Sequence, residues 1–436
     1  MAQRRPAADL PSVPERASVA GATAAPTRTR RGALVTFSSL QNNRDYRFLW
    51  TGNLFANAAQ WLQVFTIGWL VFSISGGSAL HSVAAAAIRF LPILALGPWA
   101  GVLADRLDRR AIAIFTQLGL AVLAVLFALL VAGREVAVWH AYTYMSLAGI
   151  GFAINQPVRQ ALVADTVRRV DLPNALALNA MGVTSMRLVG PLIGGLLITT
   201  VGFKWNFFFE SGLYIGMVVL LLPMRTPYRE VVIDPRASMW ADLVQGLGYI
   251  ITNKVMLQLT VLNFVRSALF MPLVLLLPAY TQQVLGAGVG TGTAMIATMG
   301  ISGFAATFVM AAWGFFIKKG RVALITLMSG SGAIIVLGLS HWLWLSLLLM
   351  VVMGLSQTYF IVSNQTLVQT MVPDALRGRI SSVWHYESGL IPLAAVLIGL
   401  IAEYSNISFA LTSVGAGALL LSVLFIFRFK DIRSLD

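Results

Sequence analysis

The sequence predicts an all-α membrane protein with twelve transmembrane helices, arranged as two pseudo-symmetric six-helix bundles. Three observations support this: the composition, the alternation of apolar runs with short basic segments, and a motif that recurs in both halves. The 436 residues are 58% hydrophobic and only 11% charged, whereas a soluble globular chain carries about 25% charged residues. This excludes a soluble enzyme, because such a chain in water would expose apolar area on a scale that causes aggregation.

The apolar runs define the twelve predicted spans. A run of about 18 or more apolar residues is a candidate transmembrane helix, and lipid offers the backbone no hydrogen-bond partner outside a helix. The predicted spans are residues 46–74, 80–103, 111–132, 138–162, 173–199, 205–223, 255–282, 289–316, 321–340, 342–370, 380–402 and 407–427.

The positive charge indicates topology. A net charge of +14 would suggest a nucleic-acid partner if it formed one basic surface. Instead, 25 of the 31 Lys and Arg residues lie in the segments on one side of the spans, and only Arg134 and Lys204 lie on the other. The positive-inside rule then predicts that both termini lie in the cytoplasm, and the spacing of the basic segments argues against a nucleic-acid partner. In a bacterial cell, a protein with this topology lies in the inner membrane.

The segments outside the spans divide the chain. Residues 1–44 are rich in Pro, Ala, Thr and Arg and are predicted to be a disordered basic cytoplasmic tail, with anionic lipid as a possible contact. The long connection 224–254 separates the predicted bundles 45–223 and 255–428, and its apolar residues recur at helical spacing, which predicts an amphipathic helix at the inner interface. Residues 429–436 are predicted to be a cytoplasmic tail.

An internal repeat supports the division into two halves. Residues 155–168 and 364–377 share six of fourteen residues. Both segments end an even-numbered span at the predicted cytoplasmic side. The halves are therefore predicted to repeat in the same orientation, as in transporters whose two bundles rock about a central cavity.

A loop motif carries a resemblance to a known family. Residues 101–110 read GVLADRLDRR, which resembles the G-x-L-a-D-r-x-G-r-r signature of the major facilitator superfamily, with Asp108 in place of the usual glycine. The resemblance implies that this loop forms charge pairs and helix-end contacts that hold a cytoplasmic gate shut. The alternative is that it only obeys the positive-inside rule. The predicted gating residues here are Gly101, Asp105, Arg106, Arg109 and Arg110.

The fifth span adds a second resemblance. Gly190, Pro191, Gly194 and Gly195 are similar to the core of the superfamily's antiporter signature, with a proline kink and glycines that permit close helix approach. These four residues are also predicted to act in gating. The run Arg89-Phe90-Leu91-Pro92 resembles the bacterial branch that includes enterobactin-type siderophore exporters and macrolide efflux permeases. The resemblance covers about residues 40–430 and implies a monomeric transporter.

Charged residues inside spans are functional-site hypotheses, because their insertion is costly. They are Arg89, Arg159, Arg187, Glu210, Arg266 and Glu387. Four positive charges against two negative ones favour a cavity that accepts anions. Arg187 and Arg266 are predicted either to bind substrate or to partner buried polar groups, and Arg89 is interpreted as structural.

Uncharged polar and aromatic residues complete the predicted substrate site. Asn53, Asn57 and Gln60 form a stripe at i, i+4 and i+7 that should face a cavity or a polar partner, and Trp61 is a candidate stacking group. The alternative is interhelical hydrogen bonding without a substrate role. The other predicted substrate-binding residues are Asn155, Asn263, Gln357, Asn364 and Trp384, and most remaining tryptophans, Trp69 among them, are assigned to the interfacial belt.

The energy source is predicted to be an ion gradient. The sequence has no Walker A motif, which excludes ATP hydrolysis on this chain, and with no Cys and four scattered His it predicts no metal and no cofactor. If protons are exchanged, the candidate carriers are Glu387 with its neighbour His385, and Glu210, with Glu403 at the outer end of a span. Sodium is the alternative ion.

The prediction for function is export of a small amphipathic organic compound, which can be anionic, by proton antiport through alternating access. Two alternatives stay open, an importer of the same fold and a receptor or assembly partner without flux. A membrane enzyme is disfavoured, because the spans contain no catalytic constellation at usable spacing.

Overall fold

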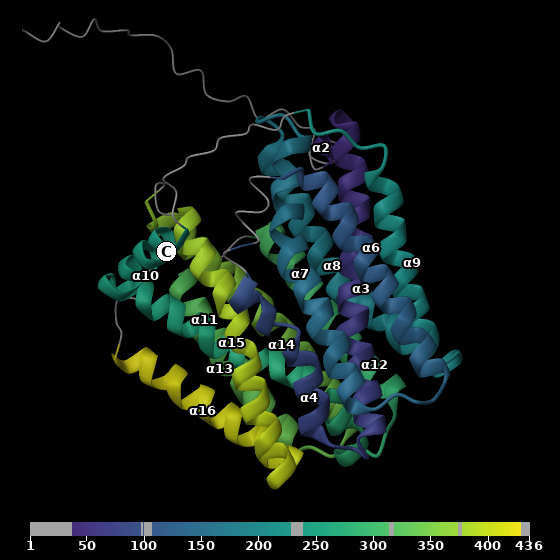
Figure 1. Ribbon diagram of the computed structural model, residues 1–436. Coiled ribbons are helices and arrows are strands. Elements are labelled where there is room, and N and C mark those ends of the chain that lie inside the picture. Colours follow the sequence, from purple (N-terminus) through teal and green to yellow (C-terminus); the bar gives the residue numbers. More distant parts are fainter. Residues whose placement is uncertain are drawn as a thin grey trace, which may run out of the picture. The chain divides into compact units, whose positions relative to one another are not determined.

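The computed structural model describes residues 37–96, 99, 107–227, 239–313, 318–373 and 377–428, and every element in these ranges is a helix (Figure 1). The elements are α2 (Ser38–Asn42), α3 (Arg44–Ile74), α4 (Ala79–Ile88), α6 (Arg109–Ala132), α7 (Val138–Thr166), α8 (Leu172–Thr200), α9 (Phe203–Leu221), α10 (Met239–Thr252), α11 (Lys254–Ala279), the π-helix η1 (Tyr280–Val284), α12 (Val289–Trp313), α13 (Lys319–Leu339), α14 (Leu343–Met371), α15 (Arg377–Tyr404) and α16 (Ile407–Arg428).

Every predicted span overlaps a helix, although α4 ends at Ile88, inside the second span (80–103), and the helical residues after it are described only through residue 96 and at 99. Among the described residues, nine helical segments are long and apolar enough to cross a membrane. The other three predicted spans correspond to α7, α9 and α15, which carry Arg159, Glu210 and Glu387 within them. The all-α membrane architecture predicted from composition is therefore confirmed.

Short polar side chains start several of these helices. The Ser78 hydroxyl accepts from the His81 N–H at 3.2 Å at the start of α4, and the Asp108 carboxylate accepts from the Arg110 N–H at 2.9 Å at the start of α6. Such caps satisfy backbone donors that have no partner within the helix. Between α3 and α4 the chain turns at Gly76 and Gly77, whose φ values of 72° and 89° suit a residue without a Cβ.

Helix α3 is the most enclosed of the nine segments. In its most apolar window 83% of the residues are buried, compared with 28% in α8 and in α16. α3 packs against α4, α7, α8, α9 and α11. Its side chains must therefore find partners within the protein, whereas much of α8 and α16 is left for lipid.

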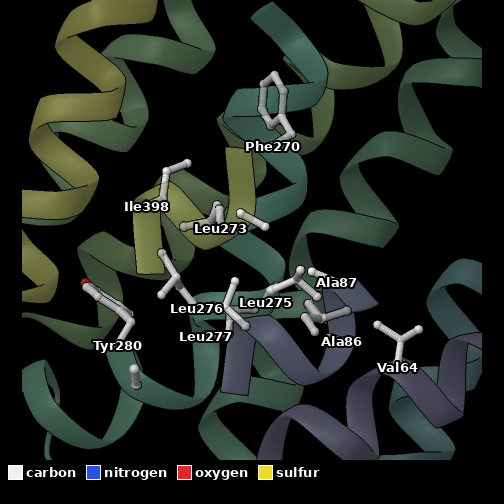
Figure 2. Close-up of a cluster of buried hydrophobic side chains, with 14 of the residues drawn as sticks. Val64, Ala86, Ala87, Phe270, Leu273, Leu275, Leu276, Leu277, Tyr280 and Ile398 are labelled. Carbon is white, nitrogen blue, oxygen red and sulfur yellow. The ribbon is translucent and has the colours of Figure 1, made fainter. Parts of the chain in front are cut away.

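Helices from the two halves of the sequence share one apolar core. Figure 2 shows Leu273, Leu275 and Leu276 of α11 near Ala86 of α4 and Ile398 of α15. α4 packs against both α15 and α11, and α12 packs against α8. We call this contact region between the first-half helices α3 to α9 and the second-half helices α11 to α16 the seam.

The start of the described chain corrects one prediction. The range 1–44 was predicted to be a disordered tail, but Ser38–Asn42 form helix α2. The Ser39 hydroxyl donates to the Asp171 carbonyl at 2.9 Å, and the Asn43 amide donates to the Asp171 carboxylate at 3.1 Å. The prediction is wrong for residues 38–44. The partners that hold these residues lie far along the chain, so the local sequence contains no pattern that would predict the bonds. Residues 1–36 lie outside the described residues.

The predicted amphipathic helix coincides with α10. Val244, Leu247 and Ile251 are exposed on it, at i, i+3 and i+7, while Ile250 is buried. α10 packs against α11 and α15. The exposed apolar residues lie at the spacing of one helix face, as expected for a helix at a membrane interface.

Candidate functional site

Two groups of contacts identify the two ends of the helices. Gln283 Nε2 at the end of η1 donates to the Gly77 carbonyl at 2.9 Å, and Ser78 at the start of α4 bonds Glu403 near the end of α15. We call this the predicted outer end. The other end carries Arg109 and Asp165 and is called the predicted cytoplasmic end.

Arg187 lies at the seam. Its guanidinium lies over the Trp61 indole of α3, 4.8 Å from the ring centroid, a cation–π geometry. The next residue, Leu188, packs on α12, where a Cβ at Gly300 would lie 2.7 Å from its Cδ1. Arg187 is nevertheless exposed, and Trp61 is half-buried. These contacts place the Arg187 cation between α3 and α12, at the seam.

A second arginine faces the same region from the other half. Arg266 of α11 is close enough to Arg187 for the two charges to repel each other. Its Nε donates to Asn263 Oδ1 at 3.2 Å, and its Nη2 donates to the Ser267 hydroxyl. Two predicted substrate residues, Asn263 and Arg266, are thus neighbours of a third, Arg187. The arrangement concentrates positive charge, which suits an anionic ligand.

An apolar pocket adjoins Arg187 toward the predicted outer end. Its free volume is about 20 Å³ in this conformation, which is room for about one water molecule, so the halves must separate for a larger ligand to enter. The lining comes from both halves and consists of Trp61, Val64, Phe65, Gly68, Trp69, Pro191, Val274, Leu275, Pro278 and Ile296. Trp69 is only 2% exposed, so its assignment to the interfacial belt was wrong. Its position near the end of a span had suggested the interfacial belt. Packing against α12 instead buries the ring, so closely that a Cβ at Gly292 would lie 2.5 Å from Trp69 Cζ2.

The α3 stripe faces a polar partner. Arg159 of α7 donates to Asn53 Oδ1 at 3.3 Å and to Asn57 Oδ1 at 3.4 Å, and Asn53 also donates to Asn179 at 3.1 Å. All three stripe residues are buried, and the Gln60 carbonyl accepts from Arg89 Nη1 at 3.1 Å. Hydrogen bonds within the first half thus account for much of the stripe, which matches the structural alternative.

Glu210 lies in a polar cluster inside the first half. Its carboxylate accepts from Gln63 Nε2 at 2.7 Å and from the Tyr144 hydroxyl at 2.8 and 2.9 Å. The side chain of Glu210 is fully buried. Arg89, which lies 4.5 Å from the Phe152 ring centroid, attracts this carboxylate electrostatically. The cluster satisfies a charge that burial alone would penalise.

The repeat-related asparagines have different surroundings. Asn155 is fully buried and accepts from Gln117 Nε2 of α6 at 3.2 Å, so it bonds within the first half. Asn364 is also buried and donates to the Leu259 carbonyl of α11 at 3.5 Å. Gln357 is half-buried on α14. The prediction that Asn155 faces the seam is therefore wrong, because α6 supplies its polar partner.

The predicted loop gate is described only in part, since Gly101, Asp105 and Arg106 lie outside the described residues. Arg109 Nη1 donates to both Asp165 oxygens, at 2.9 and 3.1 Å. Arg110 Nε donates to the Leu221 carbonyl at 2.9 Å. These bonds tie α6 to α7 and α9 within the first half, and the gating role stays a prediction.

The glycines of the fifth span are close-contact positions. A Cβ at Gly190 would lie 2.8 Å from the Ala58 carbonyl oxygen, and one at Gly194 would lie 3.1 Å from Phe65 Cδ1. A Cβ at Gly195 would lie 2.7 Å from Thr293 Cβ of α12. Gly190 and Gly194 therefore allow α8 to approach α3, whereas Gly195 allows it to approach the second half. Pro191 lies inside α8 between them.

Trp384, His385 and Glu387 lie on helix α15, and their side chains are outside the described residues.

Sequence reasoning missed Gln63 and Tyr144 as partners of Glu210. Gln63 continues the α3 stripe one turn beyond Gln60, a spacing that would have identified it. It also missed the bond between Ser78 and Glu403, since nothing local relates residues so far apart in the chain.

Comparison with known proteins gives a consistent picture. The model of the family described as transmembrane secretion effector matches residues 35–436. The chain is 24% identical over 391 residues to the staphyloferrin A transporter of Staphylococcus aureus, covering 89% of this chain and 97% of that protein. It is 27% identical over 353 residues to the enterobactin exporter EntS of Shigella boydii, covering 76% of this chain and 79% of the relative.

Solved structures show the same fold. The crystal structure of a POT family transporter in complex with a thioalcohol-conjugated peptide matches with a TM-score of 0.71 at 12% identity. The match covers 89% of this chain and 96% of that one. At this identity the similarity establishes the fold alone.

Proposed function

This chain belongs to the transmembrane secretion effector family of the major facilitator superfamily, and from that premise we propose that it exports a small amphipathic anion from the cytoplasm. Membership of the family makes it a membrane transporter rather than an enzyme. The proposal adds the substrate class, the direction, twelve membrane spans in two six-helix bundles, and an inner-membrane location with both termini in the cytoplasm.

The observation that carries the proposal is Arg187 seated on Trp61 at the seam. A charged side chain inside a span is costly and is retained where it has a function. Arg187 is exposed, contacts Trp61 of α3, and lies close enough to Arg266 of the second half for the two charges to repel each other. We assign it to the acidic group of the substrate, with Arg266 as the second cation.

The adjoining pocket supplies the apolar part of the site. Trp61 is shared between the Arg187 contact and the pocket lining. An amphipathic anion would place its acidic group on Arg187 and its apolar body against Trp61, Phe65 and Trp69. Among the relatives, the proteins named as a staphyloferrin A transporter and an enterobactin exporter handle small organic compounds, which supports the size class.

The pattern of contacts supports loading from the cytoplasm. The described hydrogen bonds between the two halves, such as Gln283 to Gly77, lie at the predicted outer end, and Gly195 meets Thr293 at the same level of the seam as the pocket. The pocket is therefore closed toward the predicted outer end. Alternating access would expose it there after the halves separate at that end.

We propose proton antiport as the energy source, with Glu387 and His385 as the exchanging groups. Glu387 lies on α15, which packs against α4 and α11 at the seam. Glu210 is a weaker candidate, because Gln63 and Tyr144 already bond its carboxylate inside the first half.

The test is a thermal-stabilisation screen of detergent-purified protein with paired compounds, each an amphipathic carboxylate and its neutral amide. We expect carboxylates to stabilise the wild type and to lose this effect in Arg187→Gln, while Arg187→Lys keeps part of it. Each stabilising compound is then assayed for flux in proteoliposomes with and without a pH gradient. Equal stabilisation by the amides, or gradient-driven accumulation toward the cytoplasmic side, would contradict the proposal.

A further inference from the structure

We propose that Glu403 is a proton-binding site that locks the predicted outer end of the transporter when it is ionised and releases it when it is protonated. The inference rests on the proposed function for its role in transport. Its structural content, a carboxylate that joins the two halves, rests on two hydrogen bonds and is tested separately.

Glu403 bonds the start of a helix in the opposite half. Its Oε2 accepts from the Ser78 hydroxyl at 3.0 Å and from the Leu80 N–H at 3.3 Å. Ser78 is the N-cap residue of α4, and Leu80 is the second residue of that helix. Glu403 therefore completes the cap of a helix that belongs to the first half, although it lies near the end of α15.

The position of Glu403 suits hydrogen bonds to an anion. A helix N-terminus carries unpaired N–H groups and a partial positive charge, both of which stabilise an anion. Hydrogen bonds to an ionised group are about twice as strong as those between neutral groups. Protonation of Glu403 would remove the charge that strengthens both of its bonds and would weaken the contact between α4 and α15.

A hydrogen-bond chain extends from Glu403 to a titratable side chain. The Ser78 hydroxyl also lies 2.8 Å from His81 Nδ1. Because this hydroxyl has one proton and donates it to Glu403, His81 Nδ1 must donate to Ser78 in this arrangement. When Glu403 takes up a proton, Ser78 can instead donate to His81. The donor and acceptor roles along the Glu403–Ser78–His81 hydrogen bonds can therefore run in either direction.

The surroundings leave Glu403 open to the outer medium. The side chain is exposed, and it lines a cavity of about 290 Å³ together with Ser78, Gln283, Ser405 and Asn406. The lining contains no Lys or Arg among the described residues. His81 on α4, stacked on Tyr142 of α7, is the titratable group that faces this cluster through Ser78, and Gln283 of η1 faces it as a neutral amide.

The contact also lies where a lock would act. Gln283 donates to the Gly77 carbonyl one residue before Ser78, and a Cβ at Gly399, one turn before Glu403 on α15, would lie 3.4 Å from Leu80 Cα. Separation of the halves at this end must break the Glu403 bonds. An acidic outer medium would thus favour the outward-open state, from which an exporter releases its substrate.

The experiment measures the opening of this end directly, without substrate or gradient. The chain has no native cysteine, so spin labels can be placed on Ala132→Cys and His341→Cys, exposed positions of the first and second halves at the predicted outer end. Distance distributions are recorded in lipid nanodiscs at pH 7.5 and pH 4.5. We expect the longer-distance population to rise about twofold relative to the shorter one at pH 4.5, where a carboxyl is only partly protonated.

The variants separate the proton site from its surroundings. Glu403→Gln should show the longer distance at both pH values, Ser78→Ala should shift in the same direction by a smaller amount, and Glu135→Gln, an exposed acidic residue at the same end, should behave like the wild type. Identical wild-type distributions at the two pH values, or an acid response that survives in Glu403→Gln but is lost in His81→Gln, would overturn the assignment. Because no transport is measured, failure of the export proposal would leave this readout unchanged.

Discussion

Thr293 of α12 fills the space at the seam that a side chain on Gly195 of α8 would need. A Cβ on Gly195 would lie 2.7 Å from both Thr293 Cβ and Cγ2. The two residues come from different halves of the chain. The absence of a side chain at position 195 is thus what allows the halves to meet beside the apolar pocket.

Gly195→Ala should destabilise this conformation. Overpacking of a filled contact typically costs about 1–3 kcal/mol, and here the cost falls on the closed form of the predicted outer end. We expect a lower thermal midpoint in detergent and a shift of the spin-label distances toward separation. The double variant Gly195→Ala/Thr293→Gly, which moves the missing side chain to the other helix, should recover part of both losses.

A matched control exists in the same half. Gly212 lies in helix α9, where an added Cβ meets nothing within 4 Å, so Gly212→Ala should leave the distances unchanged. If Gly212→Ala and Gly195→Ala had equal effects, the loss would reflect helix composition and not the contact with Thr293.

Arg159→Gln should destabilise the first half. Arg159 donates to Asn53, Asn57 and Gln156 and is only 4% exposed. Removing the donors leaves buried amide oxygens without partners, which costs about 1–3 kcal/mol. The midpoint of thermal unfolding in detergent measures the effect, and Lys204→Gln, at an exposed position, serves as the control. A wild-type midpoint for Arg159→Gln would mean that Asn53 and Asn57 find other donors.

The helices could be predicted from the sequence because lipid imposes one rule on every span. An apolar run inside a membrane has to be helical, so a local pattern is sufficient, and each of the twelve predicted runs overlaps a helix in its described residues. The same reasoning failed at residues 38–44, because α2 is held by Asp171 and Asn174, more than 100 residues away.

The candidate site was only partly predictable for the same reason. Arg187 and Trp61 were identified because a charge and a large aromatic ring inside spans are rare locally. Whether a polar residue faces the seam or a neighbour in its own half depends on helix rotation and packing. That is why Asn155 was wrongly placed, and why Ser78 and Glu403 could be paired only with the fold in hand.

Acid should weaken the attachment of α2. The hydrogen bond from Asn43 lowers the pKa of Asp171, with a further contribution from Arg168. A carboxyl whose pKa is lower in the folded state contributes stability above its unfolded pKa and loses it as the pH falls through the folded value. The difference in thermal midpoint between wild type and Asp171→Asn should therefore be largest near pH 7 and shrink toward pH 3. A difference that stays constant over this range would show that the Asp171 charge contributes nothing.

Glu210→Gln should retain proton-driven transport, whereas Glu387→Gln should lose it. Glu210 is fully buried and accepts hydrogen bonds from Gln63 and from the Tyr144 hydroxyl, which lies within reach of both carboxyl oxygens, so proton exchange with either side would require this cluster to open. Gln63 and Tyr144 can still donate to the amide oxygen of a glutamine, which preserves the packing of α3, α7 and α9.

Tyr144→Phe removes the hydroxyl donor and should lower the unfolding free energy by about 1–3 kcal/mol without changing the dependence of flux on the gradient. Flux in proteoliposomes at equal and unequal pH distinguishes the two roles. If Glu210→Gln transported at the same rate with and without the gradient while Glu387→Gln behaved like the wild type, the carrier would be the carboxylate in the first half.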